Sequence, residues 1–310
     1  MNSLPGGKQT RRIKRPVHGV LLLNKPVGLT SNAALQTAKR LLQAEKAGHT
    51  GTLDPFAEGL LPLCLGEASK FASWQLEADK VYRATLYLGV TTTTGDLEGE
   101  MLTHAPVQVN ESVLRRVLTE FLGTIQQLPP MYSALKVDGK PLYVYARAGI
   151  TIERKLRQVH IRRIELLRFT SPLVEIDVTC SAGTYIRTLA EDIGARLACG
   201  AHLTQLKRLS SGGYLINEAV TLEVLQHADV SQQMGFIRPM DSLVAHLPRV
   251  NVERDVAQAL VRGQHPYCMQ PTQIGVVRVF CAERFVGLVE WGDTGMMIPK
   301  RLISAHLCLE

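Results

Sequence analysis

One acidic residue, Asp54, lies in a stretch of small residues where a carboxylate could act on a substrate. The stretch runs Gly48-His49-Thr50-Gly51-Thr52-Leu53-Asp54-Pro55, and the nearest other acids are Glu45 and Glu58. Pro55 disfavours helical backbone at Asp54, so the carboxylate is expected on an extended or turn segment. The two glycines allow another backbone or a ligand to approach closely. A lone carboxylate so placed indicates a nucleophile or a charge stabiliser, although Asp-Pro and Thr-Gly are also ordinary turn dipeptides.

The other reactive side chains lack the spacing of a metal or cofactor site. The six cysteines are scattered without a Cys-x-x-Cys pair, and the nine histidines show no His-Glu-x-x-His motif. These patterns argue against a zinc site and against a disulfide framework. There is also no Gly-x-Gly-x-x-Gly or P-loop motif. The sequence therefore predicts neither a cofactor nor a metal.

Positive charge is concentrated in two segments of this 310-residue chain, whose net charge is +7. Residues 1–15 carry five bases and no acid, and residues 131–168 carry nine bases against three acids. Local basic patches are the electrostatic signature of a polyanionic partner such as a nucleic acid. No apolar run approaches the roughly 20 residues of a membrane span, and the N-terminus lacks the apolar core of a signal peptide. We therefore expect a cytoplasmic protein without a membrane partner.

Hydrophobic periodicity predicts the elements that must position Asp54. A buried strand over 20–23 is followed by a helix with Ser31 as its N-cap, and the Asp54 loop comes next. Period-two alternation places Tyr82 on the apolar face of a strand over 80–90. Further expected elements are a strand over 60–65, a helix over 67–77, a polar loop over 91–100, a helix capped by Asn110, a strand over 173–180 and a helix that follows Gly183.

The irregular alternation of strands and helices predicts an α+β fold, with a mixed, largely antiparallel sheet flanked by helices. Residues 1–16 are polar and aperiodic, which indicates a disordered basic arm. Residues 17–247 are expected to form the large domain. Residues 248–310, with a helix over 252–261 and strands over 274–280, 285–290 and 296–298, are expected to form a small β-rich domain.

Five ordered motifs carry a resemblance to a known family. The Asp54 loop and its continuation to Ala68-Ser69-Lys70 fit the pattern GHxGxLDPxAxGxLPxxxGxATK, with Ser69 where threonine is more usual. The other motifs are Lys80-Val81-Tyr82-Arg83-Ala84, Pro129-Pro130-Met131-Tyr132-Ser133-Ala134-Leu135-Lys136, Gly183-Thr184-Tyr185-Ile186-Arg187-Thr188-Leu189 and Leu203-Thr204-Gln205-Leu206-Lys207-Arg208. Together they resemble the TruB family of bacterial tRNA pseudouridine-55 synthases. The likeness spans roughly residues 17 to 305, and residues 248–310 look like the RNA-binding PUA domain.

The resemblance implies that Asp54, Tyr82 and Arg187 form the catalytic set. Converting uridine to pseudouridine moves the C1′ bond from N1 to C5 without redox change, so a carboxylate near C1′ is the essential group. Arg187 would hold Asp54 ionised, with the planar bidentate geometry that suits arginine. Tyr82 would pack on the flipped base and could act as a base. The sequence leaves open whether Asp54 attacks C1′ or assists a glycal route.

The resemblance also implies a set of tRNA-binding residues. His49 would enter the space that the extruded base leaves in the T-loop, and Leu206 would line the base pocket. Lys70 would support the loop or meet a phosphate. Residues 129–157 would form a thumb that closes over the T-stem-loop, with Tyr132 and Lys136 among its aromatic and basic side chains. Guide-dependent relatives lack such a thumb, so the implied enzyme needs no guide RNA or obligate protein partner and is expected to be a monomer.

Two other classes of function remain compatible with the sequence. A tRNA-binding or tRNA-folding protein would use the same surface without catalysis, and would not need the set of Asp54, Tyr82 and Arg187. An RNA N-glycoside hydrolase would need a positioned water and usually a general base near C1′. No second acid is tied to Asp54 by spacing.

Overall fold

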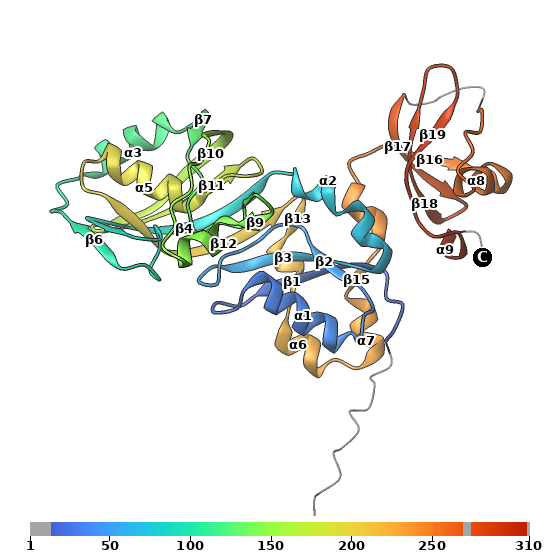
Figure 1. The fold of residues 1–310 in the computed structure, drawn as a ribbon, viewed down its shortest axis with the longest axis horizontal. Coiled ribbons are helices and arrows are strands. Elements are labelled where there is room, and N and C mark those ends of the chain that lie inside the picture. Colours follow the sequence, from blue (N-terminus) through green and yellow to red (C-terminus); the bar gives the residue numbers. More distant parts are fainter. Residues whose placement is uncertain (1–13, 269–273, 309–310) are drawn as a thin grey trace, which may run out of the picture.

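A large mixed sheet forms the body of the protein in the computed structural model, which describes residues 14–268 and 274–308 (Figure 1). The main path of this eleven-stranded sheet is β14-β1-β3-β12-β4-β11-β10-β7. Its described pairs are antiparallel except β1 with β14 and β3 with β12. The predicted α+β fold is thereby confirmed. The strands are β1 (Gly19–Lys25), β2 (Ala47–His49), β3 (Glu58–Leu65), β4 (Lys80–Leu88), β7 (Gly123–Gln127), β10 (Arg157–Thr170), β11 (Leu173–Cys180), β12 (Ala201–Ser211), β13 (Tyr214–Leu215), β14 (Val220–Thr221) and β15 (Ile237–Arg238).

Helices cover the two halves of this sheet separately (Figure 1). One group lies beside β1 and the other beside β4 and β11, and each group has its own apolar core. The first group is α1 (Ser31–Leu41), α6 (Leu222–His227) and α7 (Val230–Gly235), and the second is α3 (Glu111–Glu120) and α5 (Ile186–Arg196). The remaining short elements are β5 (Val90–Thr92) with β6 (Met101–His104), β8 (Lys136–Val137) with β9 (Lys140–Pro141), α4 (Leu142–Arg147) and the 3-10 helix η2 (Ile216–Glu218).

The junction of the two halves is a close backbone contact at the centre of the sheet. Strands β3 and β12 pair in parallel over only two positions, with Lys207 opposite Glu58 and Arg208 opposite Gly59. Gly59 has a φ of +109°, and a Cβ there would stand 2.4 Å from the Arg208 carbonyl oxygen. Only glycine fits this position, because its missing side chain permits both the torsion and the approach. The Asp54 loop enters β3 directly before this contact.

The C-terminal part folds into a four-stranded sheet that docks on the large domain (Figure 1). The Phe71 and Phe285 rings lie 5.2 Å apart, and Arg278 pairs with Asp241 at 3.0 Å. The two parts therefore share one continuous apolar core. The elements here are β16 (Arg249–Val252), α8 (Arg254–Val261), β17 (Gly275–Cys281), β18 (Arg284–Trp291), β19 (Met297–Leu302) and α9 (Ala305–Cys308), resting on η1 (Gly66–Phe71), α2 (Ala72–Leu76) and η3 (Met240–Val244).

Three local predictions were wrong in detail. The N-cap of α1 is Thr30, whose hydroxyl accepts from the Ala33 N–H, whereas Ser31 is buried and bonds elsewhere. The helix expected over 67–77 starts as the 3-10 helix η1, in which residues three apart eclipse each other, and becomes α-helical only in α2. Most of the predicted basic arm lies outside the described residues, but Arg15 is anchored, since its guanidinium donates to the Leu42 carbonyl at 2.8 Å.

The described residues contain no helix that is long and apolar enough to cross a membrane.

Candidate active site

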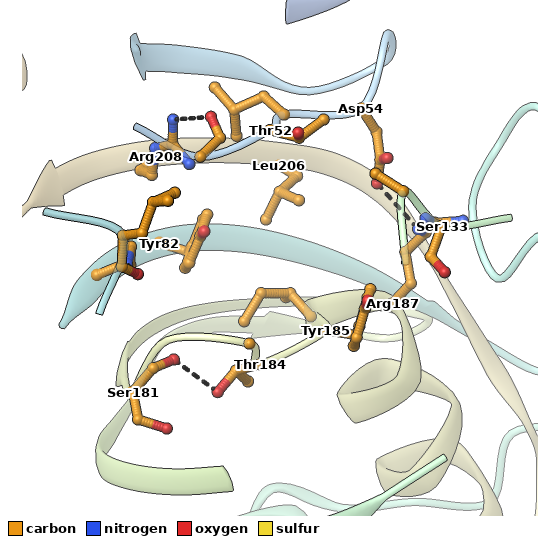
Figure 2. A pocket seen from close by; sticks show the side chains of 17 residues that line it. Thr52, Asp54, Tyr82, Ser133, Ser181, Thr184, Tyr185, Arg187, Leu206 and Arg208 are labelled. Atoms are coloured by element: carbon orange, nitrogen blue, oxygen red, sulfur yellow. Dashed lines mark hydrogen bonds and ion pairs between the residues drawn. The ribbon is translucent and has the colours of Figure 1, made fainter. Parts of the chain in front are cut away.

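A cavity of about 280 Å³ opens at the centre of the large sheet (Figure 2). The Asp54 loop forms one wall, and strands β4 and β12 and the start of α5 form the others. Asp54, Tyr82, Arg187 and Leu206 all line it, although they come from four separate stretches of the sequence. The size is near the lower end of small-molecule sites, roughly 300–1,000 Å³. The structure thus brings the predicted catalytic residues into one cavity with one of the predicted binding residues.

Asp54 and Arg187 form an ion pair at the mouth of this cavity. The Arg187 Nε lies 3.0 Å from the Asp54 Oδ2, and the dashed contact in Figure 2 marks this pair. The Arg187 side chain is 5% exposed and that of Asp54 is 34% exposed. The carboxylate therefore faces the open cavity, while the guanidinium is enclosed behind it. This arrangement leaves Asp54 accessible to a substrate that enters the cavity.

Arg187 contacts four acceptors and does not form a bidentate pair with one carboxylate. Besides Asp54, its Nη1 lies 3.4 Å from the Asp96 Oδ2 and donates to the Thr94 carbonyl at 3.0 Å. Its Nη2 donates to the Tyr132 carbonyl at 2.6 Å. The expected bidentate pairing with Asp54 is therefore wrong. A cation in the first turn of α5 is disfavoured by the helix dipole, and two carboxylates offset that repulsion.

Asp96 is the part of this site that the sequence did not reveal. It is buried in the turn between β5 and β6, where its Oδ1 accepts from the Thr94 hydroxyl at 2.5 Å and the Glu98 N–H at 3.0 Å. Its segment was predicted only as a polar loop. The one available signal was an acid beside Thr and Gly in that loop. Asp54 is therefore not the lone acid of the site, because Arg187 lies between it and Asp96.

The electrostatics of the site raise the pKa of Asp54. Partial burial is the main cause, and the nearby Asp96 charge acts in the same direction. Arg187 opposes both effects through its charge and its hydrogen bond. Arg187 is the largest influence that favours the ionised carboxylate, so the pKa of Asp54 is sensitive to that contact.

Tyr82 and Arg208 line the end of the cavity away from Asp54 and Arg187, with Leu206 beside them (Figure 2). The register of β4 with β12 places Arg208 opposite Tyr82. Arg208 is 1% exposed, and its Nε donates to the Leu60 carbonyl at 2.7 Å. Burial raises the pKa of the Tyr82 phenol, although Arg208 opposes the shift. Tyr82 is therefore a neutral phenol at neutral pH, suited to packing on a base and donating a hydrogen bond.

Lys80 adds a second cation at the same end of the cavity as Arg208. It was not among the site residues predicted from the sequence. It lines the cavity and donates to the carbonyls of Leu76 and Ala78 at 2.6 and 2.5 Å. Burial lowers its pKa to about 8. Its ammonium caps the end of α2 and so fixes the start of β4 beside Tyr82.

A second cavity of about 450 Å³ lies on the other side of the Asp54–Arg187 pair. His49 and Tyr132 line it, together with Tyr143 and Arg147 from α4. The His49 Nδ1 is buried without a hydrogen-bond partner among the described residues, and burial lowers the pKa of this imidazole. The His49 ring therefore lines the same cavity as Asp54 and Arg187, and its role as a stacking histidine stays a prediction.

Two predicted binding residues lie outside both cavities. Lys70 is at the junction with the C-terminal sheet, where it pairs with Glu67 at 2.7 Å and donates to the Leu302 carbonyl at 3.1 Å. Its side chain remains 30% exposed. Lys136 is exposed on the β8–β9 hairpin. Lys136 is thus accessible to a phosphate of a large ligand, whereas the Lys70 ammonium is already paired within the protein, and neither lies beside Asp54.

Part of the basic segment is neutralised within the protein. Along β10, Arg163 pairs with Glu165 at 2.8 Å and Arg168 with Glu175 at 3.6 Å, and Arg162 pairs with Asp79. These exposed pairs each contribute little to stability. Three of the nine bases in residues 131–168 are thus paired with acids. The remaining excess of positive charge lies in residues 136–157, of which Arg147 lines the second cavity described above.

Sequence and structure comparisons agree on the family. The TruB family pseudouridylate synthase N-terminal domain matches residues 39–186, the tRNA pseudouridylate synthase B C-terminal domain matches residues 187–245, and the C-terminal domain of pseudouridine synthase II TruB matches residues 248–303. A "tRNA pseudouridine synthase B" of Thiobacillus denitrificans is 53% identical over 94% of this chain and 97% of its own length. One of Aromatoleum aromaticum is 51% identical over 97% of each chain.

Two solved structures share the fold. A chain of a Cbf5-Nop10-Gar1 complex superposes with a TM-score of 0.72 at 28% identity, over 94% of this chain and 86% of that one. A chain of an H/ACA RNP bound to a substrate RNA containing 2′-deoxyuridine gives a TM-score of 0.71 at 25% identity, over 94% and 88%. The fold and site define a pseudouridine synthase, an isomerase. This chain belongs to the TruB family of pseudouridylate synthases.

Proposed function

We propose that this protein converts the T-loop uridine at position 55 of tRNA to pseudouridine. The observation that carries the proposal is the Asp54–Arg187 pair at 3.0 Å, set in a cavity that also holds Tyr82 and Leu206. The names of the relatives, tRNA pseudouridine synthase B, support tRNA as the substrate.

The reaction follows from the contents of the cavity. The flipped uracil packs between Tyr82 and Leu206, which places C1′ of its ribose at Asp54. The C1′–N1 bond breaks, the base turns within the pocket, and C1′ bonds to C5. The proton at C5 leaves to solvent, and N1 gains one. Asp54 stabilises or covalently traps C1′ during this exchange, and Arg187 holds the carboxylate in place.

The second cavity and the thumb supply the contacts that offset base flipping. Extruding a base costs on the order of a few kcal/mol. His49 fills the gap in the T-loop, Tyr132 and Lys136 lie on the thumb, and Lys70 meets a phosphate near the C-terminal domain. Phosphate contacts of this kind make binding strongly dependent on salt. In this proposal the enzyme acts in the cytoplasm as a monomer, without a guide RNA or obligate protein partner.

The test is tritium release from an unmodified tRNA transcript labelled at uridine C5, followed by separation of the product nucleosides. We expect release with pseudouridine at one T-loop position, and no release by Asp54→Asn. Tight tRNA binding without release by the wild type would instead favour an RNA-binding or RNA-folding protein. Free uracil among the products would favour a glycoside hydrolase.

A further inference from the structure

Ser31 makes two hydrogen bonds to the backbone of the residue that precedes Asp54. Its hydroxyl accepts from the Leu53 N–H at 2.7 Å and donates to the Leu53 carbonyl at 2.9 Å. Ser31 is 2% exposed and Leu53 is also buried. Leu53 lies outside the strands of the sheet, so one serine hydroxyl satisfies both of its backbone groups.

The loop is also held on either side of this contact. The Arg208 Nη2 donates to the Gly51 carbonyl at 3.3 Å. The Pro55 carbonyl accepts from the Gly28 N–H at 2.8 Å and the Lys25 ammonium at 3.4 Å. The anchored positions 51, 53 and 55 therefore alternate along the loop. Residues 25–31 anchor positions 53 and 55, and Arg208 anchors position 51.

The Ser31 contact bears on Asp54 more directly than the other anchors do. It fixes both backbone groups of Leu53, and the Leu53 carbonyl belongs to the peptide bond that leads into Asp54. Within this loop, Arg208 and Lys25 each hold only one carbonyl, and both carry a charge, so replacing them would also change the electrostatics of the site. Ser31 is neutral, so its removal leaves the charges of the site unchanged.

We propose that Ser31 is a positioning residue for Asp54, an inference that rests on the proposed function and adds a residue to it. The carboxylate must meet C1′ while it keeps its contact with Arg187, and misplacement by about 1 Å can lower a rate by about 100-fold. Without the hydroxyl, the Leu53 N–H and C=O lose their partners in a buried place. The loop then shifts to find others, and Asp54 moves with it.

The chain offers a matched control in the neighbouring residue. Thr30→Ala removes the N-cap hydrogen bond of the same helix, at 3.0 Å to the Ala33 N–H, without touching the loop. Loss of such a cap lowers the stability of the helix, and so the Tm of the variant. Ser31→Ala removes the loop contact, and Ser31→Thr keeps the hydroxyl. If the added methyl of Ser31→Thr prevents folding, Ser31→Cys supplies a weak donor and acceptor of similar size.

The experiment measures the single-turnover rate of tritium release, the Kd for the tRNA transcript and the Tm of each variant. We expect Ser31→Ala to lower the rate about 10- to 100-fold with a Kd within about twofold of the wild type. Ser31→Thr should recover most of the wild-type rate. If Ser31→Thr does not fold, the rate of Ser31→Cys should lie between those of Ser31→Ala and the wild type. Thr30→Ala should react at the wild-type rate despite its lower Tm.

Three results would overturn the inference. They are a Ser31→Ala rate within twofold of the wild type, an equal loss in Thr30→Ala, or a loss explained entirely by weaker tRNA binding. A wild-type enzyme that releases no tritium would instead remove the proposed function. The failure of one proposal is therefore distinguishable from the failure of the other.

Discussion

Replacing Arg187 by lysine tests whether the shape of the guanidinium, and not only its charge, supports catalysis. Arg187 reaches Asp54 at 3.0 Å, Asp96 at 3.4 Å, the Thr94 carbonyl at 3.0 Å and the Tyr132 carbonyl at 2.6 Å. A lysine keeps the positive charge but presents its donors on one nitrogen, so it cannot span these four acceptors. At least one buried acceptor then loses its partner, and Asp54 loses its fixed orientation.

The magnitude follows from the lost contacts. A hydrogen bond to a charged group contributes about 1.5–3 kcal/mol. If the transition state loses one such contact at Asp54, the rate falls by about 10- to 150-fold, since each 1.36 kcal/mol is tenfold. Stability should fall by about 1–3 kcal/mol, the cost of an unsatisfied buried group.

The assay is single-turnover tritium release together with chemical unfolding, and Arg83→Lys is the control. Arg83 makes two 2.9 Å contacts with Asp177, but the pair is exposed and lies outside both cavities. An exposed pair contributes roughly 0–1 kcal/mol, so Arg83→Lys should keep its rate and nearly all its stability. If Arg187→Lys reacts within twofold of the wild type, the geometric argument for Arg187 is refuted.

Four further predictions concern the charge of Asp54, the influence of Asp96 on it, the Tyr82 phenol and the domain junction. Burial raises the pKa of Asp54 in the folded state, so the free energy of unfolding falls as the pH rises through that pKa and the group ionises. Asp54→Asn should therefore release no tritium, yet its Tm at pH 7 should be no lower than that of the wild type. For the same reason, the acid limb of the pH–rate profile should lie above the usual range of an aspartate, and Asp96→Asn, which removes a neighbouring negative charge, should move any remaining activity to lower pH. Tyr82→Phe keeps the ring, so tRNA binding measured by filter retention should stay within about threefold, while the single-turnover rate reports whether the hydroxyl takes part in the chemistry. Glu67 accepts from the Ser304 N–H at 2.8 Å and pairs with Lys70, so Glu67→Ala should speed hydrogen exchange in η1 and at the end of β19, with unchanged exchange in β11.

Local patterns predicted several of the individual elements. The alternation over 173–180 coincides with β11, and Asn110 caps α3 through its side chain. These features depend on neighbours a few residues apart, so the sequence alone carries them. The helix start at Thr30 was misplaced by one residue because Ser31 is an equally good capping residue by type, and its burial against Leu53 is invisible in the sequence.

Only part of the candidate active site could be predicted from the sequence. The motifs identified Asp54, Tyr82 and Arg187, and their catalytic roles stay predictions until the rates are measured. Asp96 carried no distinctive spacing, and its contact with Arg187 joins residues 91 positions apart. Lys70 was predicted to serve the loop or the tRNA, and its contact with Leu302 depends on how the C-terminal sheet docks.

The difference between what could be predicted from the sequence and what could not has a physical cause. The sequence by itself determined that Asp54 lies on non-helical backbone in a glycine-bearing loop, because Pro55 restricts the backbone of Asp54 and the neighbouring glycines permit tight turns. Only the tertiary structure decided which groups face that carboxylate. The register of β4 with β12 places Arg208 opposite Tyr82. The start of α5 places Arg187 between Asp54 and Asp96. Such contacts depend on packing between distant segments, which no local pattern encodes.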